Sequence, residues 1–266
     1  MKNTFKAFIF VLPLVMFLQF CKKDKKTDPE PEPDPKVTPV VTSPESMKIQ
    51  FSNLVDADPL VLDKKYVSPK GDTFSVSKFN YYISNIVLTK NDNSVVAVNN
   101  LYQIIKQSDE ASRTINISGI PEGSYKAIKL MLGVDSARNR SGAQTGGLDI
   151  AYASDMYWNW NQGYIFLKLE GTSPASASNQ ISYHIGGYGG TYKAQREFVF
   201  NFVTEQMNIA ASKTPTLNLT VNVNEMFKSP TQVDFAIKPT IASPGQDAQM
   251  IADNYADMIK FGSLKN

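Results

Sequence analysis

Residues 217–224 read Leu-Asn-Leu-Thr-Val-Asn-Val-Asn, and this strict alternation of apolar and polar side chains is the clearest structural signal in the chain. In an extended strand successive side chains point to opposite faces, so the apolar side chains of this stretch would share one face. Such a pattern is typical of a strand that lies on a core and has its other face in water. The stretch therefore predicts a half-buried β-strand.

Similar short stretches occur along the chain from residue 47 onward. Ile49 and Phe51 alternate with Gln50 and Ser52. Further candidate strands are residues 81–88, 114–117, 125–132, 164–169, 181–185 and 198–203. Clusters of Gly, Pro, Asn and Ser separate them. Many short strands joined by turns predict an all-β fold, an antiparallel β-sandwich in which consecutive strands pair.

Helix is expected mainly near the C-terminus. Ile251, Tyr255, Met258 and Ile259 follow the spacing of one helix face, and Asp247 is a suitable N-cap after a Pro-Gly pair. These residues predict a short C-terminal helix of about three turns. A shorter helical turn is expected at residues 223–228, whereas residues 136–147 are polar and glycine-rich, which favours a long loop.

The N-terminus resembles a bacterial lipoprotein signal peptide. Lys2 and Lys6 precede an apolar run at residues 7–20, which is shorter than the roughly 20 apolar residues needed to span a bilayer. Cys21, the only cysteine, follows this run directly. We therefore expect residues 1–20 to be a signal peptide and Cys21 to carry a lipid that anchors the protein to the outer membrane, facing the periplasm or the cell exterior.

Residues 21–46 are charged and rich in proline, so they cannot bury apolar surface and are expected to form an extended tether. The domain prediction is a signal peptide at 1–20, a tether at 21–46 and a β-sandwich domain at 47–266. The 27 basic and 25 acidic residues give a net charge of +2. This balance provides no basic field for nucleic acid.

The candidate chemistry of the chain is limited by its single histidine, His184. One histidine excludes a zinc site made of several imidazoles. No Gly-x-Ser-x-Gly motif accompanies it, so we do not expect an enzyme. A lone histidine is often a hydrogen-bonded structural residue, and the carboxylates of Asp149 and Asp155 are interpreted as solvated loop groups.

A second informative stretch of the sequence is the segment 155–171, which contains both tryptophans of the chain, Trp158 and Trp160. Within it, residues 156–164, Met-Tyr-Trp-Asn-Trp-Asn-Gln-Gly-Tyr, and residues 166–171, Phe-Leu-Lys-Leu-Glu-Gly, resemble the signature segment of the MbnP-like family. Members of that family are periplasmic copper-binding proteins associated with methanobactin-type copper handling. The likeness extends over residues 47–261.

The resemblance implies a β-sandwich that binds copper through histidines and through a tryptophan oxidised to kynurenine by a partner di-haem peroxidase. Kynurenine has an aniline nitrogen that indole lacks, and nitrogen ligands suit copper. By position, the modified residue would be Trp158 or Trp160, and His184 would be the imidazole ligand. Because the chain has no second histidine, Met156, a tyrosine or water would complete the coordination.

Two other interpretations of the aromatic segment remain open. In an extended strand the two indoles would lie on the same side. With Tyr157 and Tyr164 they could stack on sugar rings, with the amides of residues 159–162 as hydrogen-bonding partners, which would make the protein a surface glycan-binding lipoprotein. Alternatively both indoles belong to a purely structural core. An indole face open to solvent favours the glycan site, and a ring edge turned toward His184 favours the metal site.

Overall fold

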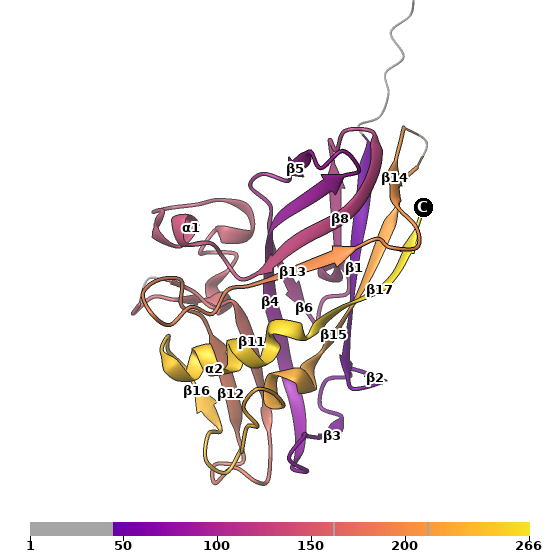
Figure 1. Cartoon of the computed structure of the whole chain (residues 1–266). Coiled ribbons are helices and arrows are strands. Elements are labelled where there is room, and N and C mark those ends of the chain that lie inside the picture. The colour runs from indigo at the N-terminus through magenta and orange to yellow at the C-terminus, as the bar shows by residue number, and fades with distance from the viewer. Residues whose placement is uncertain (1–44, 162, 212) are drawn as a thin grey trace, which may run out of the picture. The chain divides into compact units, whose positions relative to one another are not determined.

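The computed structural model describes residues 45–161, 163–211 and 213–266. The expected signal peptide, the lipidation residue Cys21 and residues 21–44 of the expected tether lie outside the described residues. The described chain is an all-β sandwich of two large sheets with a short helix near its C-terminus, which confirms the expected fold class (Figure 1). None of the helices in these residues has the length and apolar character needed to cross a membrane.

The first sheet has the strand order β17-β15-β1-β2, and β7 also pairs with β1. Its strands are β1 (Ser46–Val55), β2 (Asp58–Pro59), β7 (Thr114–Ser118), β15 (Thr216–Asn222) and β17 (Ile259–Lys265). The second sheet has the order β13-β8-β4-β11-β12-β16, with β3, β5 and β6 paired to β4 and β14 paired to β8. Its strands are β3 (Lys65–Val67), β4 (Thr73–Lys90), β5 (Val95–Ala97), β6 (Tyr102–Lys106), β8 (Gly123–Leu132), β11 (Leu167–Thr172), β12 (Ile181–Ile185), β13 (Arg196–Asn201), β14 (Met207–Ile209) and β16 (Thr240–Ile241).

The remaining elements are short. β9 (Tyr157–Trp158) and β10 (Gly163–Tyr164) form a separate hairpin. The helices are η1 (Ala111–Arg113), α1 (Ser136–Arg140), η2 (Gly146–Leu148), η3 (Ser154–Met156), η4 (Val223–Phe227), α2 (Gln246–Asn254) and η5 (Tyr255–Asp257). The helical turn expected at 223–228 is therefore present as η4. A short helix, α1, begins the region expected to be only a loop, because the Asp135 side chain caps it by accepting a hydrogen bond from the Arg138 N–H.

The alternating stretch that predicts a strand forms β15, with Leu217, Leu219 and Val221 fully buried. β15 pairs with β1 in parallel, although consecutive antiparallel pairing was expected. Parallel neighbours need a long crossover connection, and here most of the second sheet lies between the two strands in sequence. The turn at residues 118–123 likewise joins β7 and β8, which belong to different sheets.

Aromatic side chains fill the space between the two sheets. Phe51 on β1 meets Tyr81 on β4 edge to face, with ring centroids 6.1 Å apart. The Tyr81 hydroxyl donates to Oδ1 of Asn53 at 2.9 Å, so this buried phenol is hydrogen-bonded inside the core. Such a pairing satisfies the one polar atom of a large apolar side chain. It joins the two sheets by packing and by a hydrogen bond.

The long strand β4 determines where residues 133–166, which include both tryptophans, leave the sheet (Figure 1). Along one edge it pairs first with β11 and then with β8, and the change occurs at Tyr82. There the Tyr82 N–H donates to the Phe166 carbonyl, and the Gly133 N–H donates to the Tyr82 carbonyl. Residues 133–166 therefore leave the sheet at the end of β8 and return at the start of β11. A Cβ at Gly133, whose φ is +120°, would lie 3.1 Å from the Phe166 ring, so this junction requires glycine.

The C-terminal helix is shorter than expected. Its N-cap position is Gly245, and Asp247 lies in the first turn instead. Met258 and Ile259 were assigned to the helix, but the chain leaves it after Asn254, and Ile259 begins β17. β17 pairs with β15, so the backbone groups of the last residues are used at a sheet edge rather than in a helix.

Candidate metal site

The tryptophan segment lies in the excursion of residues 133–166. η3 leads into the β9–β10 hairpin, where Trp158 pairs with Gly163. The strand ends at Trp158, so Trp160 lies in the following turn and not on the same extended strand. The two rings are nevertheless adjacent, with centroids 5.9 Å apart and planes at 50°. Trp158 is 5% exposed and Trp160 is 66% exposed, so one indole faces the interior and the other faces solvent.

The Trp158 indole packs directly against Gly186, the residue that follows β12. A Cβ at Gly186 would lie 2.7 Å from Cζ3 and 3.0 Å from Cη2 of the indole, and 2.7 Å from the Tyr164 carbonyl oxygen. Glycine is therefore the residue that this contact allows. Cζ3 and Cη2 belong to the benzo ring, so the carbon edge of the indole, and not its nitrogen, faces the end of β12.

His184 lies on β12, directly opposite Lys168 on β11. Gly186 lies two positions after His184, just beyond the end of β12 at Ile185. The contact with Gly186 therefore puts the Trp158 indole at the end of the strand that carries His184. The two residues are distant in sequence.

The imidazole of His184 is partly covered, with 21% of its side chain exposed. Its Nε2 lies 2.8 Å from Oε1 of Glu170 and 3.3 Å from Oγ of Ser182. Glu170 and Ser182 form the next pair along the same face of β11 and β12. One ring nitrogen is therefore committed to a carboxylate.

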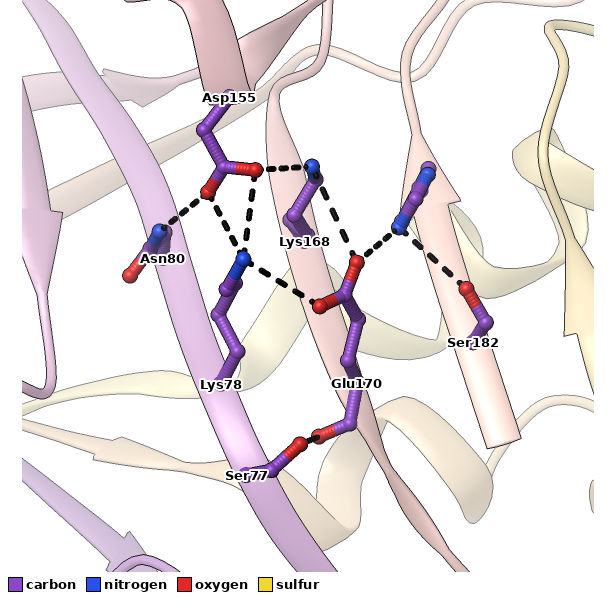
Figure 2. Close-up of polar contacts among 8 residues, drawn as sticks. Ser77, Lys78, Asn80, Asp155, Lys168, Glu170 and Ser182 are labelled. Atoms are coloured by element: carbon purple, nitrogen blue, oxygen red, sulfur yellow. Dashed lines mark hydrogen bonds and ion pairs between the residues drawn. The ribbon is translucent and has the colours of Figure 1, made fainter. Parts of the chain in front are cut away.

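Four charged side chains beside His184 form what we call the ion cluster, namely Lys78, Asp155, Lys168 and Glu170 (Figure 2). The Lys168 ammonium lies 2.7 Å from Asp155 and 3.9 Å from Glu170. The Lys78 ammonium lies 3.2 Å from Asp155 and 3.3 Å from Glu170. Each lysine contacts both carboxylates, and the Lys168 side chain is only 7% exposed. The two positive and two negative charges cancel, which makes burial of Lys168 tolerable.

The ion cluster fastens the tryptophan segment to the sheet. Asp155 belongs to η3, three residues before Trp158, whereas Lys78 belongs to β4 and Lys168 to β11. Asp155, interpreted as a solvated loop residue, is 48% exposed but lies in η3, and its carboxylate also contacts two ammonium groups. The cluster instead fixes the point at which η3 crosses the sheet.

Burial and charge act in opposite directions on the pKa values of the carboxylates. Burial tends to raise the pKa of Asp155, but the hydrogen bonds and charges of Lys168 and Lys78 outweigh it and lower that pKa. Burial likewise opposes the hydrogen bond from His184 and the nearby lysine charges at Glu170, and the net effect lowers the Glu170 pKa. Both carboxylates are thus ionised at neutral pH.

The imidazole is neutral under the same conditions. Burial is the largest influence on the pKa of His184 and lowers it. The hydrogen bond to Glu170 raises this pKa, but not enough to offset burial. A neutral imidazole is the form that binds a metal ion.

Most of the folded chain matches a single protein family. The MbnP family model matches residues 44–243, a span that includes His184 and both tryptophans. This chain belongs to the MbnP family. Among solved structures, MbnP from Methylosinus trichosporium is similar at 15% identity and a TM-score of 0.48, over 71% of this chain and 80% of that chain. Among curated proteins, no match was found.

In this MbnP family member the described residues include one side chain with the surroundings of a metal-binding histidine, His184. A ligating histidine usually donates its other ring N–H to a carboxylate or carbonyl, and His184 has such a partner in Glu170. The intact Trp158 indole presents carbon atoms, and not its nitrogen, to the end of β12. No group of three or more His, Cys, Asp or Glu side chains is placed to hold a metal ion among the residues described.

Met156, expected as a further ligand, is 1% exposed and belongs to the hydrophobic core. Its backbone N–H donates to the Ala153 carbonyl, within the turn of η3. The structure therefore brings Trp158 to the end of the strand that carries His184 and puts Trp160 beside Trp158. Met156 instead packs in the hydrophobic core.

Sequence reasoning does not reveal the ion cluster of this MbnP family protein. The one local indication is Lys168, which stands between two apolar neighbours in a predicted strand. A lysine buried in such a position needs a partner of opposite charge. Glu170, two positions later, lies on the same face. Lys78 and Asp155 come from other elements, so no local pattern shows them.

Proposed function

We propose that this MbnP family protein is an exported copper-binding lipoprotein in which His184 is one ligand and an oxidation product of Trp158 is another. The observation that carries the proposal is the 2.8 Å contact between His184 Nε2 and Glu170, which leaves the second ring nitrogen for a metal. Trp158 is preferred over Trp160 because its indole packs against Gly186, two positions after His184 at the end of the same strand.

The chemistry of the second ligand requires an oxidant that the chain does not contain. Two equivalents of peroxide cleave the C2–C3 bond of indole to give N-formylkynurenine and two waters, and hydrolysis then releases formate and leaves an aryl amine. A di-haem peroxidase is the expected partner that delivers these oxidising equivalents. The protein itself is a binding protein and not an enzyme. A lipid on Cys21 would hold it at the outer membrane.

Copper titration tests this proposal. The full chain with intact tryptophans is expected to bind Cu(I) weakly or not at all in competition with a chromogenic chelator. Protein in which mass spectrometry shows kynurenine, a net gain of one oxygen and loss of one carbon, is expected to bind tightly. Tight binding by the intact protein, or none by the oxidised protein, would overturn the proposal.

Matched variants locate the ligands. His184→Asn is expected to abolish tight binding by the oxidised protein, because it removes the one imidazole of the chain. Trp158→Phe is expected to do the same, while Trp160→Phe, which changes the neighbouring ring, is expected to keep it. Loss of binding in Trp160→Phe alone would move the modified residue from Trp158 to Trp160.

A glycan-binding function is the second candidate, and the exposure of Trp160 favours it. This indole is 66% exposed, and Asn159 and Asn161 beside it are exposed as well. An open indole face with neighbouring amides can stack on a sugar ring and hydrogen-bond to its hydroxyls. Slower migration in polysaccharide-containing gels, lost in Trp160→Ala, is the expected result. Unchanged migration of the wild-type protein across neutral and acidic polysaccharides would contradict this function.

A further inference from the structure

The two ring nitrogens of His184 have different surroundings. Nε2 lies 2.8 Å from the Glu170 carboxylate and 3.3 Å from the Ser182 hydroxyl. Within residues 45–161, 163–211 and 213–266, no hydrogen bond reaches Nδ1. A neutral imidazole carries one hydrogen, on one nitrogen only. The surroundings decide which nitrogen carries it.

Glu170 can act only as an acceptor. An ionised carboxylate has no hydrogen to donate, so a hydrogen bond between it and Nε2 requires the hydrogen to be on Nε2. The carboxylate is also held in place independently of the histidine, because Oε2 lies 3.3 Å from the Lys78 ammonium. The Lys168 ammonium lies 3.9 Å from Oε1. The acceptor is therefore held by two lysines in addition to its contact with His184 (Figure 2).

We propose that Glu170 is a positioning residue that holds His184 in the tautomer with its hydrogen on Nε2, so that Nδ1 is the nitrogen that is offered to a ligand. The use of Nδ1 for copper rests on the proposed function. The tautomer of His184 does not depend on copper and is determined by the contacts of the metal-free protein.

The ion cluster extends this positioning to the tryptophan segment. The same two lysines that hold Glu170 also hold Asp155 of η3, at 2.7 Å from Lys168 and 3.2 Å from Lys78. A charge lost at Glu170 therefore changes the pairing of Asp155, three residues before Trp158. The imidazole and the η3 turn that precedes Trp158 are thus connected by one shared set of contacts.

Nitrogen NMR of the copper-free full chain, labelled with ¹⁵N only at histidine, tests the tautomer. Because His184 is the only histidine, the spectrum contains the two ring nitrogens of one residue. At neutral pH we expect the one-bond N–H coupling on Nε2 and the shift of an unprotonated nitrogen on Nδ1. Protonation of Nδ1 with a bare Nε2 would overturn the proposal, whether or not any variant folds.

Two variants separate positioning from mere packing. Glu170→Gln keeps the side-chain shape, but its amide can donate as well as accept, so the two nitrogen shifts are expected to move toward each other as both tautomers become populated. Glu197→Gln removes a carboxylate from the exposed Lys129 ion pair and is expected to leave both shifts unchanged. Wild-type shifts that persist in Glu170→Gln would show that Glu170 does not set the tautomer.

The outcome is independent of copper binding. An Nε2–H tautomer in a protein that never binds Cu(I) would refute the proposed function and leave the role of Glu170 intact. Tight Cu(I) binding by a protein with the hydrogen on Nδ1 would refute the positioning role and leave the proposed function intact.

Discussion

The benzo ring of Trp158 lies so close to the backbone of Gly186 that a Cβ at position 186 would lie 2.7 Å from Cζ3 of the indole. The same Cβ would lie 2.7 Å from the Tyr164 carbonyl oxygen. Neither the backbone nor a buried indole can move easily in a packed interior. The tryptophan hairpin and the strand that carries His184 are thus coupled at this contact.

Gly186→Ala is expected to destabilise the fold by about 1–3 kcal/mol, because the added methyl overpacks this contact. Urea-induced unfolding measures the loss, and tryptophan fluorescence should change with it as the indole moves. Gly189→Ala is the matched control, since a Cβ at Gly189 meets nothing within 4 Å. Equal destabilisation by the two variants would contradict the close packing at Gly186.

Lys168→Met is expected to lower the free energy of unfolding by about 2 kcal/mol, because it leaves two carboxylates in the ion cluster with one lysine. Lys129→Met, in an exposed pair with Glu197, is the control and should cost about 0–1 kcal/mol. Chemical denaturation of both variants measures the difference. A Lys168 variant as stable as the Lys129 variant would show that the buried Lys168 ammonium stabilises the fold no more than the exposed ion pair does.

The two tryptophans are expected to differ in their contribution to the stability of the fold and in their access to solvent. Trp158→Ala should cost about 3–5 kcal/mol through the cavity it creates, whereas Trp160→Ala should cost within about 0.5 kcal/mol. In acrylamide quenching, the Trp160→Phe protein, which reports on Trp158, should be poorly quenched. The Trp158→Phe protein should be strongly quenched, and similar quenching of both would contradict the burial found here.

Stability is expected to fall in two steps on acidification. The pKa of His184 is lower in the folded protein than the usual value of 6.5, so the unfolded chain takes up the proton first. Stability is therefore full above about pH 6.5 and decreases as the pH falls below it. The lowered pKa values of Asp155 and Glu170 mean that their contribution is present above the usual carboxylate values and is lost as the pH falls through the folded values.

The single histidine makes the upper step easy to assign. His184→Gln should flatten the dependence of the unfolding temperature on pH above the carboxylate range, while leaving the lower step in place. Thermal unfolding at closely spaced pH values measures both steps. An unchanged upper step in this variant would show that another group causes it.

Much of the strand content could be predicted from local pattern. The alternation at residues 217–224 and the run at 181–185 correspond to β15 and β12, because burial of one face requires that period. β17 was missed, since Ile259 also fits a helical spacing, and the free edge of β15 that selects the strand is not visible in the local sequence.

The candidate site was less predictable than the fold. Trp158, Trp160 and His184 stand out by their rarity, and the family resemblance links them. The exposure of Trp160, the burial of Met156 and the contact of Asp155 with two lysines depend on how the excursion folds back over the sheet. No periodicity within residues 133–166 encodes that path.

The sequence by itself determined the all-β class and the family, because alternating burial and a rare aromatic segment are local properties. Only the tertiary structure decided that β1 pairs with β15 in parallel, and that the Glu170 carboxylate faces one nitrogen of His184. The physical reason is that a register between distant strands is selected by the total burial it achieves. Contacts between side chains on different strands follow from that register and from nothing in either strand alone.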